Sequence, residues 1–151
     1  MLIRWLLASL HLLALGIGMG SVWARRRALL AIAEPTAVAR VLYADTIWGI
    51  AAVLWLGSGL ARAFGGFEKG TVYYLHNHWF LTKMACFVLI LVLEIAPMIA
   101  FIGWRARLKR GQPIDTSRAA LYARTSGWQA ILLVVMVFAA AAMARGLGVS
   151  R

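Results

Sequence analysis

The chain has 151 residues and a formal net charge of +11, and 63% of its residues are hydrophobic while only 14% are charged. With a mean hydropathy of +0.81, it carries more apolar side chain than a soluble domain of this length can bury, so lipid must be its main solvent. The charge does not indicate a nucleic-acid-binding domain, because most of the arginines lie in short hydrophilic gaps between apolar runs. The single cysteine, Cys86, excludes an internal disulfide and a paired-cysteine metal motif.

Four apolar segments are each close to the ~20 residues that a helix needs to cross a bilayer. They comprise roughly Leu2–Trp23, Val38–Ala61, Trp79–Trp104 and Trp128–Ala144. Lipid admits only helices or closed barrels, and these runs are too long and continuous for barrel strands, so we predict an all-α integral membrane protein. The short connections favour an up-down-up-down four-helix bundle that forms a single transmembrane domain over residues 1–151.

Glycines recur in the first two segments. They are Gly16, Gly18 and Gly20 in the first segment and Gly57 and Gly59 in the second. Small residues of this kind let membrane helices approach closely, so their expected role is packing.

The basic residues set the predicted orientation. They gather in the first and third gaps, at Arg25–Arg27 and Arg105–Arg118, whereas the middle gap around Glu68 is nearly neutral. The positive-inside rule therefore places these two gaps in the cytoplasm and both termini in the periplasm, as in a multi-pass protein of the bacterial inner membrane. Since the first span precedes its arginine cluster, we expect a retained anchor and not a cleaved signal peptide.

A few ionisable side chains lie inside or beside the predicted spans, where charged groups are costly and usually face a partner, a cavity or a cofactor. At 1.5 Å per residue, His11 lies roughly 13 Å from the outer end of its span, and Lys83 lies roughly 6–8 Å from the outer end of its own. With the border histidines His76 and His78 they form an outer polar layer. The inner layer consists of Arg40, Asp45 and Glu94.

The outer groups have structural interpretations beside functional ones. His76 and His78 are typical of a membrane border next to Trp79, and Lys83 could extend its amine outward to water. His11 lies among leucines, where it could simply bond a neighbouring carbonyl or could ligate haem or a metal. Both interpretations stay open at this point.

Glu94 is expected to be paired, since a lone charge at its depth would cost several kcal/mol or be neutralised by a shifted pKa. Arg40 is the preferred partner because it enters the second span from the same side, and Arg124 is the second choice. Asp45 lies close enough to the inner border to be hydrated.

Motifs in three spans follow a familiar order. The first span carries His11, Gly20 and Arg27, the second opens with Arg40-Val41-Leu42-Tyr43 and reaches Gly57, and the third has Trp79 and Lys83 four residues apart. In order and spacing they resemble the HemJ-type four-helix membrane proteins, which are haem-containing protoporphyrinogen oxidases. More loosely, they resemble the CopD-type copper-resistance membrane domain.

The chain departs from the HemJ-type pattern at two places. Glu94 stands where that family has a histidine, and the run Arg124-Thr125-Ser126-Gly127-Trp128 lacks the family's Asn-Glu pair and proline. The oxidase activity is therefore not carried over. We expect the nearest relatives to be a sister family of small, uncharacterised bacterial inner-membrane proteins.

The resemblance implies a b-type haem with His11 as its axial ligand. Lys83 would be the second ligand or a propionate partner, and Trp79 would form a wall of the pocket. His78 is the better of the two border histidines to join them, because it lies nearer Lys83. A haem needs an imidazole, a slot between helices and cations for its propionates, and His11, the glycines and the outer Lys83, His76 and His78 could provide them.

Three classes of function stay open. The first is a haem-b-binding membrane protein for electron transfer or tetrapyrrole oxidation, which would make the chain an oxidoreductase. The second is a small transport or copper-handling protein in which Lys83, Glu94 and Asp45 form a polar path. The third is a non-catalytic accessory subunit, within a homo-oligomer or a larger membrane complex. Nucleic acid is not an expected partner in any of them.

Overall fold

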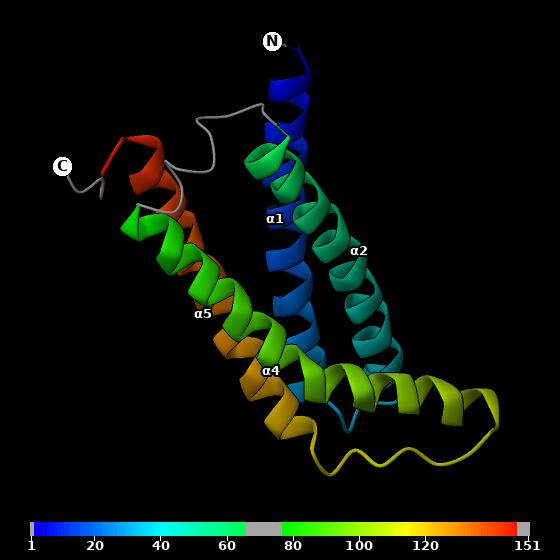
Figure 1. Cartoon of the computed structure of the whole chain (residues 1–151). Helices are drawn as coiled ribbons and strands as arrows, with labels where there is room; N and C mark the ends of the chain where they lie inside the picture. The colour runs from blue at the N-terminus through cyan, green and yellow to red at the C-terminus, as the bar shows by residue number, and fades with distance from the viewer. Residues whose placement is uncertain (1, 66–76, 148–151) are drawn as a thin grey trace.

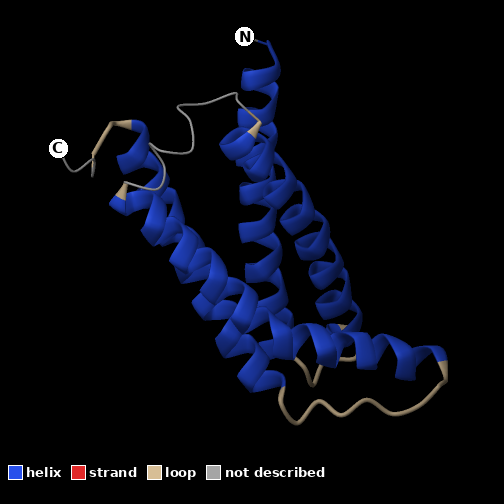
Figure 2. Ribbon diagram, in the orientation of Figure 1, coloured by secondary structure: helices blue, strands red, loops and turns tan. Residues whose placement is uncertain are grey.

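The computed structural model of the chain describes residues 2–65 and 77–147. Four long helices dominate these residues (Figures 1 and 2): α1 (Leu2–Leu30), α2 (Ala37–Phe64), α4 (His78–Lys109) and α5 (Ala119–Ala144). Each is long and apolar enough to cross a membrane. The prediction of an all-α, four-helix membrane bundle is confirmed.

The helices pack in an order that leaves α2 and α4 almost apart. Helix α1 packs along α2 on one side and along α5 on the other, and α5 packs against α4. Helices α2 and α4 touch only weakly. The start of α1 and the end of α5 lie at one end of the bundle, and the α1–α2 and α4–α5 connections lie at the other (Figure 1). Any firm link between α2 and α4 must therefore come from long side chains.

The helices extend beyond the predicted apolar spans, most clearly at two ends. Helix α1 continues from Trp23 to Leu30, so Arg25 belongs to the helix, and the prediction that it lies in a connecting loop is wrong. Helix α5 begins at Ala119, well before the predicted start at Trp128. Hydropathy shows where an apolar segment ends. A helix continues past that point if one of its faces still packs against other residues.

Two apolar clusters lie at different depths in the bundle. The loop-end cluster consists of Ala28, Leu29, Val41, Phe101, Trp104, Ala119, Tyr122 and Ala123. The central cluster consists of Val22, Trp48, Cys86, Ile90, Ala130, Leu133 and Met136. In each of the four helices, a short interval of sequence separates the residues of the two clusters. These intervals hold one group of polar residues, namely Arg25, Asp45, Glu94, Ser126 and Gln129.

Helix α4 is capped at its start and bent within its length. The Asn77 side-chain oxygen accepts hydrogen bonds from the backbone N–H groups of Trp79 (2.9 Å) and Phe80 (3.3 Å), which satisfies donors that the first turn would otherwise leave unpaired. Its side-chain nitrogen donates to the Leu147 carbonyl at 3.2 Å. Pro97 lies inside α4, and its missing N–H and bulky ring explain the change of direction visible in Figure 1.

The outer surface of the bundle is apolar. Only 17% to 28% of the most apolar window of each helix is buried within the protein, and large side chains such as Leu13, Val53 and Ile99 are exposed. A surface of this kind is stable against lipid tails and not against water. The bundle is therefore suited to a lipid bilayer.

Candidate functional site

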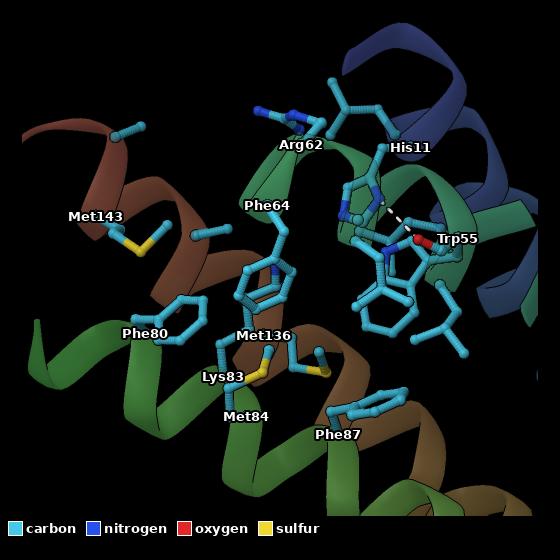
Figure 3. Close-up of a pocket in the computed structure, with 17 residues that line it drawn as sticks. His11, Trp55, Arg62, Phe64, Phe80, Lys83, Met84, Phe87, Met136 and Met143 are labelled. Atoms are coloured by element: carbon cyan, nitrogen blue, oxygen red, sulfur yellow. Dashed lines mark hydrogen bonds between the residues drawn. The ribbon is translucent and has the colours of Figure 1, made fainter. Parts of the chain in front are cut away.

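A cavity of about 440 Å³ lies in the half of the bundle where α1 begins and α5 ends (Figure 3). All four helices contribute to its wall, and the lining is mostly leucine, phenylalanine and methionine. Its polar groups come from His11, Arg62 and Lys83. A volume within ~300–1,000 Å³, an apolar wall and a few convergent polar groups are the usual features of a small-molecule pocket.

His11 is the polar centre of this cavity, and α2 fixes its orientation. Its Nδ1 lies 3.0 Å from the Trp55 carbonyl oxygen and 3.0 Å from the Ser58 hydroxyl, while that hydroxyl donates to the same carbonyl at 3.1 Å. A carbonyl can only accept, so Nδ1 carries a hydrogen, and in a neutral ring the lone pair then lies on Nε2. Metal-binding histidines are commonly oriented by such a bond from their other ring nitrogen.

Trp55 and Gly59 hold the plane of the imidazole. The His11 and Trp55 rings stack with centroids 5.3 Å apart and planes 19° apart. A Cβ at Gly59 would lie only 3.0 Å from Cε1 of His11, whereas a Cβ at Gly57 would have no neighbour within 4 Å. Of these two glycines, only Gly59 is needed for the position of His11.

Lys83 reaches the same cavity from α4. Its Nζ lies 5.9 Å from the centroid of the Trp55 ring, which is within the range of a cation–π contact. The Trp55 ring also packs against Phe87, with ring centroids 5.6 Å apart. The Trp55 indole N–H is buried and has no hydrogen-bond partner in the part of the chain that the structure describes. The structure thus brings His11 and Lys83 together around Trp55, which the sequence did not single out.

His78 and Trp79 are not brought into this cavity. Both lie in the first turn of α4 and are exposed, and α4 contributes to the wall through residues from Phe80 onward. This geometry does not support the predicted role of His78 and Trp79 in binding a cofactor. His76 lies outside the described residues.

The inner polar residues form a network around Arg25, which is fully buried. Its Nη1 donates to Asp45 at 3.0 Å and to Glu94 at 2.7 Å, and its Nη2 donates to the second Glu94 oxygen at 2.8 Å. Nη2 also donates to the Gln129 side-chain oxygen at 2.7 Å, and Nε donates to the Ser126 hydroxyl at 3.1 Å. The five N–H groups of a guanidinium are thus all matched by acceptors from α2, α4 and α5.

Two further contacts complete this network, which we call the Arg25 network. The second Asp45 oxygen accepts from Arg105 at 2.8 Å, which links α2 directly to α4. The Gln129 side-chain nitrogen donates to Glu94 at 2.6 Å. Two arginines therefore face two carboxylates, and Asp45 is paired where we expected it to be simply hydrated.

The prediction that Glu94 is paired is confirmed, but both predicted partners are wrong. Arg40 pairs with Glu34, and both side chains are exposed, while Arg124 is exposed on α5. Arg25 was missed because hydropathy places it in a run of three arginines after an apolar segment. Its spacing from His11, Ala14, Gly18 and Ser21, which are all buried on α1, continues one helical face and was the available signal.

The fold and the cavity together define a small multi-pass membrane protein with a histidine-centred pocket between its helices. The chain belongs to the family described as predicted membrane protein (DUF2214), which it matches over residues 3–148. We found no match to the chain among curated proteins or among solved structures. An uncharacterised membrane family was expected, but the resemblance to HemJ-type and CopD-type proteins is not shown by these comparisons.

Replacing Arg25 with methionine should lower the free energy of unfolding by about 3–5 kcal/mol, because Glu94 and Asp45 would be left buried without that cation. Replacing the exposed Arg27 with glutamine should change it by less than about 0.5 kcal/mol. Unfolding in detergent, followed by circular dichroism, measures both. The double variant Arg25→Met with Glu94→Met should be more stable than Arg25→Met alone, and equal stability would contradict the pairing.

Replacing Gly59 with alanine should destabilise the protein, because the added methyl pushes an imidazole that is already fixed by Trp55. We expect a loss of about 1–2 kcal/mol, typical of overpacking. Gly57→Ala is the matched control and should stabilise by up to about 1 kcal/mol, since alanine favours the helix. Thermal unfolding of the two variants, measured in parallel, tests this account. Melting temperatures that shift in the same direction by similar amounts would contradict it.

Proposed function

We propose that the His11 cavity binds a b-type haem, with His11 as axial ligand, and that the protein serves electron transfer or tetrapyrrole oxidation in the membrane. The observation that carries the proposal is the hydrogen bond from Nδ1 of His11 to the Trp55 carbonyl. It leaves the Nε2 lone pair for a ligand and fixes the direction in which the ring points.

The other groups around the cavity suit a haem. Arg62 and Lys83 supply cations for the two propionates, and the apolar wall suits the macrocycle. The indole N–H of Trp55 is a buried donor that a bound group could satisfy. When bound, a haem supplies one-electron redox chemistry, while the protein sets its ligation, burial and surrounding charge.

Lys83 is better suited to a propionate than to the iron. Its Nζ lies over the Trp55 ring, which is the position of a cation–π contact, whereas ligation would require a neutral amine. Met84, Met136 and Met143 also line the cavity, and a methionine sulfur is a common second ligand that raises the reduction potential of a haem. We therefore assign Lys83 to the propionates and leave the second axial position to a methionine or to none.

A second candidate is Cu(I) binding in the same cavity. It is favoured by the three methionines and by His11, because thioether and imidazole groups suit Cu(I). The two cations of the lining count against it, since they favour an anionic group over a metal ion. Haem carries its own anionic propionates, so it remains the leading proposal.

A polar transport path through the bundle receives less support. Lys83 lies at the His11 cavity and Glu94 lies in the Arg25 network. The central cluster, with Val22, Ile90 and Leu133, packs between these two depths. An ion would have to cross that apolar layer without a polar partner among the described residues, which is costly.

Purified protein from haem-replete cells should show sharp reduced haem bands, and His11→Ala should abolish them because the ligand is lost. His78→Ala is the control and should keep the spectrum, since His78 lies outside the cavity. Absorption spectra, oxidised and dithionite-reduced, with metal analysis of the same samples, make the comparison. A full haem complement in His11→Ala would overturn the assignment, and copper without haem would favour the second candidate.

We further propose that both termini face the periplasm of a bacterial inner membrane. The basic residues Arg107, Lys109, Arg110 and Arg118 lie at or beyond the end of α4 and before α5, on the side expected to be cytoplasmic. Reporter fusions after Arg110 should behave as cytoplasmic and fusions at the C-terminus as periplasmic. The reverse pattern would place the His11 cavity in the cytoplasmic half of the membrane.

A further inference from the structure

A second cavity, of about 770 Å³, lies between α1 and α5 in the half of the bundle that holds the loops. Its apolar lining, which we call the floor, includes Met19, Gly20, Ile131 and Val134, and Arg26 and Arg124 also line it. We call this cavity the α1–α5 groove. It shares no lining residue with the His11 cavity, and neither the haem proposal nor the Arg25 network uses it.

The groove joins apolar surface to positive charge that no carboxylate among the described residues neutralises. Arg26 contacts Trp23 with its guanidinium carbon 5.5 Å from the ring centroid. Within residues 2–65 and 77–147, no ion pair involves Arg26 or Arg124: Glu34, Asp45 and Glu94 pair with other arginines, and Asp115 accepts a hydrogen bond from the backbone of Ser117. The two guanidinium groups are therefore available to an anion from outside the chain.

Gly127 explains how the two arginines come to share one site. A Cβ at Gly127 would lie 3.1 Å from Nε of Arg26 and 3.5 Å from its Cδ. The Arg26 side chain therefore passes over α5 at Gly127, where a larger residue would push against it. Gly127 and Arg124 are three residues apart on α5, so they lie on neighbouring turns of one helix face.

The groove opens toward the region where lipid lies. Trp128 is 58% exposed and Ile131 is 52% exposed, and both residues line it. Trp23 and Trp128 also line the groove, each about one helical turn from Arg26 or Arg124 in sequence, and tryptophan is typical of the level of the lipid headgroups. The two arginines suit the charged headgroup of a phospholipid, and the adjoining apolar floor suits its acyl chains.

We propose that the α1–α5 groove binds one anionic phospholipid, with its phosphate between Arg26 and Arg124 and an acyl chain along Met19, Gly20 and Ile131. Basic pockets between membrane helices are known to hold anionic headgroups. A zwitterionic lipid brings its own ammonium group, which the two arginines repel. The groove therefore selects lipids of net negative charge.

Native mass spectrometry of the full-length protein in detergent tests the proposal, with phosphatidylglycerol and phosphatidylcholine of identical chains titrated in parallel. Phosphatidylglycerol should bind at least about tenfold more tightly, and Arg26→Gln and Arg124→Gln should each weaken it roughly fivefold. Arg27→Gln is the charge-matched control and should leave it unchanged, because Arg27 follows on the same helix outside the groove. Equal binding of the two lipids, or equal effects of the three variants, would overturn the proposal.

The floor of the groove is tested separately with Gly20→Leu, which should weaken both lipids by filling the space for the acyl chain. Gly16→Leu is its control, since Gly16 also has open space around it but does not line the groove. If inorganic phosphate competes as well as the lipid does, the site is an anion site and the lipid assignment is wrong. If Gly20→Leu instead removes a dimer peak and leaves lipid binding intact, the groove is a contact between two copies.

Discussion

The rest of the arrangement depends on the buried guanidinium of Arg25. All of its N–H groups have acceptors inside the bundle, although the outside of the bundle faces lipid. Between membrane helices the hydrophobic effect gives no net attraction, so packing and polar contacts decide how they associate. Arg25 takes its acceptors from α2, α4 and α5, and Asp45 adds the direct link from α2 to α4 through Arg105. Helices α2 and α4, which barely touch through their backbones, are thereby held in fixed positions relative to each other.

The Arg25 network also sets the direction of His11. The two residues lie on one helix, and the buried positions Ala14, Gly18 and Ser21 between them follow a single face. Rotating α1 to keep Arg25 inside therefore turns His11 inside as well, toward the Trp55 carbonyl on α2. Near Arg25, polar side chains bridge the gap between α2 and α4, whereas near His11 the same gap is lined by apolar side chains and stays open as the cavity.

The sequence predicted the features that depend on average hydropathy, and missed those that depend on which face of a helix points inward. Four spans follow from the length of the apolar runs, and the need to pair Glu94 follows from its depth. The choice among Arg25, Arg40 and Arg124 as the partner of Glu94 depends on the rotation of each helix about its axis. Hydropathy averaged over a window of residues contains no information on that rotation. His78 and Trp79 were misplaced for a different reason: they lie near Lys83 in sequence, but they occupy the exposed first turn of α4, and the cavity wall begins only at Phe80.

The two polar layers differ in what they leave to a ligand. In the Arg25 network every donor of the central guanidinium already has an acceptor, so a ligand would have to displace an internal partner. Around His11, Nδ1 takes part in the hydrogen bonds found for the ring, and the Trp55 indole N–H has no partner among the described residues. A buried donor without a partner is rare in a folded protein because it is costly, and here it adjoins an imidazole that keeps a free lone pair. The His11 end of the bundle therefore has groups left to bind a ligand, whereas the donors of Arg25 at the other end are already used within the protein.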